Sequence, residues 1–298
     1  MAVGLVPLAS LASAFSVTAT WPWTPEKLPL LAVLEPVSEQ PPTAADRKRA
    51  ETMSATRRTT QSLRDGELAA LTGEIATCRR CPRLVAWREQ VAREKRAAYR
   101  DEEYWGRPVP GFGDPRARIA ILGLAPAAHG ANRTGRMFTG DRSGEFLYAA
   151  LWRAGIASAP RSRSRDDGLR LSGAYITAAV RCAPPANRPS PDERDNCLGF
   201  ARRELELLAD VRVVLCLGAF AWDAALRILA PAARPRPSFA HGAELAGAPA
   251  LLGSYHVSQQ NTFTGRLTEA MLDRVLARAR ELAELPVTAP GPPRRRRR

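Results

Sequence analysis

Four of the five cysteines in this sequence are spaced as metal or cluster ligands would be. Cys78 and Cys81 form a C-x-x-C pair among basic residues, and Cys182 is followed by Cys197 after fourteen intervening residues. Four thiolates can hold a tetrahedral zinc ion or an iron-sulfur cluster, whereas a lone C-x-x-C pair is also typical of redox proteins. The spacing alone does not decide between these sites, and without further information it favours zinc. Cys216 lies inside an apolar run and is expected to be a small buried hydrophobe.

Three loops carry side chains suited to acid-base chemistry or hydrogen bonding. Residues 125–141 contain His129 and Asp141, residues 181–189 contain Asn187, and His256 opens the segment 256–266. An imidazole, a carboxylate and an amide can together polarise a bond, position water and bind the edge of a ligand. Binding alone does not need this combination, so it indicates an enzyme.

The elements that must position these loops are short apolar strands. Runs with the length and composition of buried parallel strands cover residues 117–124, 173–180, 211–218 and 250–256. Helical patterns cover residues 144–155, 191–210, 220–230 and 266–285. This alternation predicts a doubly wound parallel sheet with helices on both faces. Ligands bind at the carboxyl ends of the strands in such sheets, so we expect the polar loops to converge on one rim.

Longer motifs carry a resemblance to a known family. They are CRRCPRLVAWRE at 78–89, the stretch 102–144 that ends in RMFTGDRSG, AAVRCAPPANRPSP at 178–191, and SYHVSQQNTFTGRLT at 254–268. Together they resemble the family 5, or type b, uracil-DNA glycosylases over about residues 63–285. The resemblance implies an α/β fold, namely a three-layer α-β-α sandwich with a central, mainly parallel four-stranded sheet.

The resemblance also implies an activity, a cofactor and a partner. The activity is hydrolysis of the N-glycosidic bond of uracil and related deaminated or damaged bases in DNA, which leaves an abasic site. The cofactor is a 4Fe-4S cluster on Cys78, Cys81, Cys182 and Cys197, which overturns the preference for zinc. The expected partner is double-stranded DNA, with single-stranded DNA left open, and the protein is expected to be a cytoplasmic monomer.

Two residues are expected to carry the chemistry. Cleavage of the bond develops positive charge on the sugar and negative charge on the departing base. By resemblance, His256 donates a hydrogen bond to the base carbonyl, and Asp141 positions the attacking water and offsets the charge of the sugar. The alternatives are a core histidine with satisfied hydrogen bonds at position 256 and a helix N-cap at position 141.

Four further residues are expected to contact the substrate. Phe138 is expected to stack on the extruded base and Asn187 to bind its edge, although a core phenylalanine and a turn asparagine are the alternatives. Ala125 lies where related glycosylases carry an Asp or Asn, so it can line the site but cannot activate water. His129 is a second candidate for contact with phosphate or base, with stabilisation of a turn as its alternative.

The segment after His256 is expected to contact DNA. It supplies amides, an apolar wedge and a phosphate contact, as an intercalating loop requires. The amides are Gln259, Gln260 and Asn261, the wedge is Phe263 and the phosphate contact is Arg266. Basic residues around the cysteines are expected to bind backbone phosphates, with a solvated charged face as the alternative; they are Arg79, Arg80, Arg83 and Arg88.

Charge and composition indicate a binding partner and a division of the chain into three parts. The net charge is +14, and the basic residues are not confined to the terminal run Arg294–Arg298, which favours a polyanionic partner. Residues 1–62 are predicted to be a disordered leader, 63–285 the catalytic domain and 286–298 a disordered Pro/Arg-rich tail. No apolar run reaches the length needed to cross a bilayer, so no membrane partner is expected.

Two alternatives compete with this interpretation. One is a non-catalytic protein that binds damaged or single-stranded nucleic acid and uses the cysteines for a structural metal site. The other is a member of the related family 4, which predicts an Asn at the position of Ala178 and a carboxylate where Ala127 or Ala128 stands. Neither of these family 4 features is present.

Overall fold

Four parallel strands form the centre of the computed structural model, which describes residues 43–286. They are β2 (Ile119–Gly123), β3 (Ala174–Ala178), β4 (Val213–Leu217) and β6 (Ala250–Ser254). Two antiparallel edge strands complete a six-stranded sheet in the order β1-β3-β2-β4-β6-β5; they are β1 (Phe112–Gly113) and β5 (Glu244–Leu245). The four expected strands are confirmed. The edge strands were not predicted, because two residues are too few to show a strand pattern.

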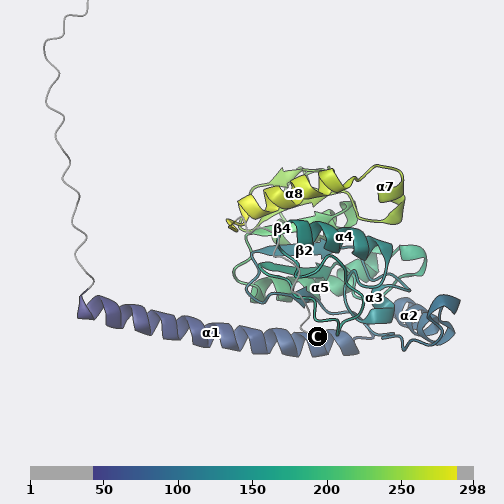
Figure 1. Ribbon diagram of the computed structural model, residues 1–298, viewed down its shortest axis with the longest axis horizontal. Helices are drawn as coiled ribbons and strands as arrows, with labels where there is room; N and C mark the ends of the chain where they lie inside the picture. Colours follow the sequence, from purple (N-terminus) through teal and green to yellow (C-terminus); the bar gives the residue numbers. More distant parts are fainter. Residues whose placement is uncertain (1–42, 287–298) are drawn as a thin grey trace, which may run out of the picture. The chain divides into compact units, whose positions relative to one another are not determined.

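Helices cover both faces of this sheet (Figure 1). On one face α4 (Arg142–Arg153) packs against α8 (Glu269–Leu282). On the other face α5 (Pro191–Leu207) packs beside α6 (Ala219–Leu229), which contacts β2, β4 and β6. The three-layer α-β-α arrangement expected from the sequence is therefore confirmed.

The core is divided by the alternation of side chains along each strand. Ile121 and Leu215 pack on the face of α4 and α8, whereas Leu122 and Val214 pack on the face of α6. Cys216 lies with the second group and is fully buried, which confirms it as a core residue. Because all five residues of β2, β3 and β4 are buried, these strands show apolar runs rather than alternation in the sequence.

Two helices precede the sheet, α1 (Ala44–Thr77) and α2 (Pro82–Glu94). The chain divides into two units, residues 1–51 and residues 52–298. Of the first unit the structure describes residues 43–51, and α1 begins there at Ala44. Residues 44–62 were predicted to be disordered and are helical instead. No proline or glycine occurs between Thr43 and Asp65, so the local sequence does not interrupt a helix. The rest of the predicted leader and residues 287–298 of the predicted tail lie outside the described residues.

In the described part of the chain, four short helical turns connect these elements, and the last three of them contribute residues to the rim at the carboxyl ends of the strands. They are η1 (Ala97–Tyr99), α3 (Ala131–Thr134), η2 (Pro185–Asn187) and α7 (Gln259–Phe263). Within residues 43–286, no helix is both long enough and apolar enough to cross a membrane.

Candidate active site

A cavity of about 650 Å³ opens at the carboxyl ends of the central strands. Its size lies within the range of cavities that bind small molecules. The predicted site residues among those lining it are Ala125, Phe138, Asp141, Asn187, His256, Gln259, Gln260 and Asn261. Three loops that are far apart in the sequence therefore meet at one rim, as the parallel topology predicted.

Phe138 is held at this cavity in a strained backbone conformation. Its φ angle is +52°, a value that few residues with a side chain adopt. The ring lies directly against Gly123, where an added Cβ would stand 2.9 Å from Cζ of Phe138. Gly144 is needed as well, because a Cβ there would collide with the carbonyl of Phe138. The ring is therefore partly buried: it packs against the core on one side, is positioned by two glycines and lines the cavity.

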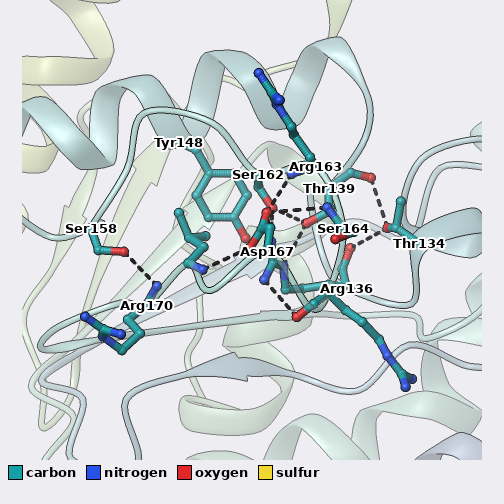
Figure 2. A network of polar contacts seen from close by, with 12 residues as sticks. Thr134, Arg136, Thr139, Tyr148, Ser158, Ser162, Arg163, Ser164, Asp167 and Arg170 are labelled. Atoms are coloured by element: carbon teal, nitrogen blue, oxygen red, sulfur yellow. Dashed lines mark hydrogen bonds and ion pairs between the residues drawn. The ribbon is translucent and has the colours of Figure 1, made fainter. Parts of the chain in front are cut away.

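A buried network anchors the backbone on both sides of Phe138 (Figure 2). Tyr148 Oη donates to the carbonyl of Met137 at 3.0 Å, and Arg136 Nε donates to Thr139 Oγ1 at 3.1 Å. Arg136 Nη2 also donates to Ser162 Oγ at 2.5 Å and to the carboxylate of Asp167 at 2.7 Å. These contacts fix the residues on either side of Phe138. Sequence reasoning missed the network, since Ser162 and Asp167 lie in a segment whose composition resembles an exposed loop.

His256 follows β6 and faces the cavity with its imidazole unpaired. No described residue forms a hydrogen bond with the ring, although the Nδ2 amide of Asn261 donates to the His256 carbonyl at 2.8 Å. Burial lowers the pKa of His256 to about 4, so the ring is neutral at physiological pH. A neutral imidazole carries one N–H, which can donate to a ligand. The alternative of a satisfied core histidine is therefore wrong.

Asp141 caps a helix and also lines the cavity. It is the N-cap of α4, and its Oδ1 accepts from the Gly144 N–H at 2.8 Å. Its Oδ2 lies against Gly130, where a Cβ would leave no room for it. Burial raises the pKa of the carboxyl group. The N-cap interpretation is confirmed, and the second oxygen remains for a ligand or a water molecule.

Asn187 and two alanines line the cavity as expected, whereas His129 does not line it. Asn187 is exposed in a left-handed conformation, with φ +55°, and no described group bonds its side-chain amide. Ala178 lines the cavity at the end of β3 beside the loop of Ala125. His129 is absent from the residues that line the cavity, and its Nδ1 is 3.1 Å from Tyr104 Oη, in a segment before β1. The role of His129 as a contact for phosphate or base stays a prediction.

The segment after His256 forms a short exposed helix at the mouth of the cavity. Gln259 and Gln260 are exposed, and Phe263 is 69% exposed, which is unusual for so large an apolar side chain. Arg266 is exposed as well, with its guanidinium 4.8 Å from the centre of the Tyr255 ring. Asn261 is the exception, since its amide is bonded to the backbone of His256.

The four candidate ligand cysteines line one small cavity beneath α2 and the end of β3. Arg88 is buried there and donates from Nη1 to Cys182 Sγ at 2.8 Å and from Nη2 to the Cys78 carbonyl at 3.1 Å. Arg181 lines the same cavity, and its Nε is buried without a hydrogen-bond partner. Among the described residues, no group of three or more His, Cys, Asp or Glu side chains could hold a metal ion as they stand.

The arginines near the cysteines are engaged within the protein. Arg79 pairs with Glu89 at 2.5 Å and Arg83 with Glu193 at 2.6 Å. Arg80 lies over the ring of Phe200, and Arg88 is buried. Arg88 is too buried to bind a backbone phosphate, whereas Arg79, Arg80 and Arg83 are exposed, so phosphate binding by these three stays a prediction.

Comparison with known proteins shows which family this chain resembles. The model of the family "Uracil DNA glycosylase superfamily" matches residues 110–280. A type-5 uracil-DNA glycosylase of Mycobacterium tuberculosis is 56% identical over 221 residues, which cover 73% of this chain and 82% of that protein. One of Thermus thermophilus is 56% identical over 213 residues, or 71% and 96% of the two chains. A type-4 enzyme of Archaeoglobus fulgidus is 36% identical over 114 residues, which cover 38% of this chain.

Proposed function

Because the chain belongs to the uracil DNA glycosylase superfamily and to its type-5 branch, we propose that it excises uracil and related damaged bases from DNA by hydrolysing the N-glycosidic bond. One observation carries this proposal: the cavity at the strand ends gathers Phe138, Asp141, Asn187 and His256. These residues provide an aromatic surface, a carboxylate, an amide and an imidazole donor around a space that fits a flipped nucleotide.

Each side chain has a distinct task in this reaction. The flipped base stacks on Phe138, and the unbonded amide of Asn187 binds its edge. The neutral imidazole of His256 donates its N–H to the base oxygen on which negative charge develops, an interaction worth about 3 kcal/mol for one well-placed donor. The free oxygen of Asp141 holds the attacking water and offsets positive charge on the sugar.

The exposed ring of Phe263 has a task outside the cavity. It stands at the mouth on α7, beside the exposed amides of Gln259 and Gln260. We propose that this helix enters the stack where the base has left it, because an apolar wedge flanked by amides can replace the lost stacking. This role requires a duplex, so double-stranded DNA is the proposed substrate and the bacterial cytoplasm the proposed place of action. We also propose that the enzyme acts as a monomer.

An excision assay tests the proposed activity. The full-length protein is incubated with duplexes that carry one uracil, one hypoxanthine or one ethenocytosine, and with an undamaged duplex as control. Alkali-labile abasic sites are expected in the uracil duplex and absent from the control. Binding to the damaged duplex without any strand breakage after alkali would instead support a non-catalytic binding protein.

We also propose that Cys78, Cys81, Cys182 and Cys197 hold a 4Fe-4S cluster. Support comes from the convergence of the four side chains on one cavity and from the buried guanidinium of Arg88, which donates to Cys182 Sγ and suits an anionic cluster. When bound, the cluster would cross-link segments that are far apart in the sequence.

The metal content of the purified protein tests this second proposal. We expect a brown protein with about four iron and four sulfide per chain. A colourless, iron-free preparation that contains zinc and excises uracil at the full rate would overturn it.

A further inference from the structure

A loop of alternating arginine and serine is bonded to the back of the candidate site. Ser162 is buried, and its hydroxyl lies 2.6 Å from Thr139 Oγ1, next to Phe138 (Figure 2). The carbonyl of Ser162 also accepts from the Gly140 N–H at 3.4 Å. Since Ser162 is held inward, its neighbours Arg161 and Arg163 are exposed. The arginine loop and the loop that carries Phe138 and Asp141 are thus fastened together.

A third exposed arginine belongs to the same surface. Arg142 follows Asp141 as the first residue of α4, two residues after the Gly140 whose N–H donates to Ser162. We call Arg142, Arg161 and Arg163 the arginine face. It lies beside the residues that line the cavity at Asp141 and Ser143.

The arginine face carries positive charge that the described part of the chain does not neutralise. No described carboxylate pairs with any of its three guanidinium groups, whereas Arg153 and Arg278 each pair with an acidic side chain. Asp167, which lies in the same loop, is already used by Arg136 and by the N–H groups of Arg163 and Leu169. Arg165 is excluded from the face because it lies near Asp166 and over the ring of Trp105.

We propose that the arginine face binds backbone phosphates of the DNA strand next to the flipped nucleotide. This inference rests on the proposed function, since it takes DNA as the substrate. A flipped nucleotide keeps its own phosphates at the mouth of the pocket, and unpaired guanidinium groups are well suited to bind them. Because Ser162 joins this loop to that of Phe138, the phosphate contacts and the base-stacking ring form one rigid unit. Phosphate binding therefore fixes where the base enters.

The salt dependence of binding tests the arginine face directly. The double variant Arg161→Gln/Arg163→Gln is compared with the control Arg116→Gln/Arg202→Gln. The control loses the same charge from two exposed arginines that have no described ion pairs. Arg116 lies just before the amino end of β2, away from the cavity at the carboxyl ends of the strands. Binding of a fluorescent undamaged duplex is measured between 50 and 200 mM salt. The slope of log K against log salt should flatten by roughly two for the first variant and remain near the wild-type value for the second.

Two further measurements separate the possible failures. Arg161→Lys/Arg163→Lys keeps the charge and should restore most of the slope, which shows that the loop still folds. On a uracil duplex, the enzyme concentration that gives half-maximal single-turnover excision should rise roughly tenfold for the glutamine variant. Equal slopes for the two glutamine variants would overturn the arginine face, whereas absence of excision by the wild-type protein would overturn the proposed function and leave the slope measurement valid.

Discussion

The rings of Phe138 and His256 face one cavity with their centres 6.4 Å apart and their planes inclined by 41°. They come from loops that follow β2 and β6, which are separated in the sheet by β4. A base stacked on Phe138 is therefore within reach of the unpaired imidazole of His256, so base capture and stabilisation of the leaving group can be tested separately.

Replacement of His256 should affect the chemical step far more than binding. His256→Ala is expected to lower single-turnover excision of uracil by roughly two orders of magnitude, because the N–H bond strengthens as negative charge develops on the base. Affinity for the damaged duplex should change little. The matched control is His129→Ala, whose ring contacts Tyr104 outside the cavity. If His256→Ala excises uracil at the wild-type rate, another donor must stabilise the departing base.

The position of the Phe138 ring should depend on Gly123. Gly123→Ala places a Cβ 2.9 Å from Cζ of Phe138, so the ring must shift and capture of every flipped base should weaken. We expect single-turnover excision at subsaturating enzyme to fall roughly tenfold for uracil and hypoxanthine alike. Gly199→Ala is the control, since nothing lies within 4 Å of its added Cβ. An unchanged rate for Gly123→Ala would show that the ring is not the stacking surface.

Asn187 should control which base is removed. Its exposed side chain has no described hydrogen-bond partner, so Asn187→Ala should lower the melting temperature only slightly, through the left-handed backbone that alanine tolerates less well than asparagine. We expect the ratio of uracil to hypoxanthine excision to fall by roughly tenfold, because a contact with the edge of one base is lost both on binding and during reaction. If both substrates lose rate equally, or neither does, Asn187 does not discriminate between them.

The neutral state of His256 predicts how stability depends on pH. The pKa of His256 in the folded protein is about 4, below the ordinary value of about 6.5 for histidine. Between these two pH values the unfolded chain therefore binds more protons than the folded one. Stability is therefore lost as the pH falls through this window. Urea unfolding should show that the wild type loses up to about 2 kcal/mol more than His256→Gln between pH 7 and pH 5. Parallel losses in the two proteins would indicate that His256 is protonated normally.

Arg88 should act on the proposed cluster through Cys182. Arg88→Gln removes a buried cation that donates to Cys182 Sγ at 2.8 Å, so the cluster should be less stable and its reduction potential altered. We expect visible absorbance to bleach several-fold faster in air and iron per chain to fall. Arg79→Gln, which breaks only an exposed pair with Glu89, serves as the control. Identical bleaching of the two variants would argue against this contact.

Much of the fold could be predicted because its strands are buried on both faces. Apolar runs at β2, β3, β4 and β6 stand out from the helices between them, and the parallel topology then brings the ends of the strands together. The rim position of His256, Asp141 and Asn187 follows from this local information, as does the burial of Cys216. The edge strands β1 and β5 were missed, since two residues carry no periodic pattern.

Only the tertiary structure decided which side chains are free to act. Sequence alone does not indicate that Arg79 and Arg83 are paired with acidic residues, or that His129 contacts Tyr104. Nor does the sequence indicate that Asp167 pairs with Arg136, so that Arg161 and Arg163 have no described acidic partner. The physical reason is that a hydrogen bond or an ion pair needs its partners within a few ångströms, and these partners are brought together by packing rather than by their spacing along the chain. The sequence therefore determined the kind of site, and the packing of the chain determined which residues are available to form it.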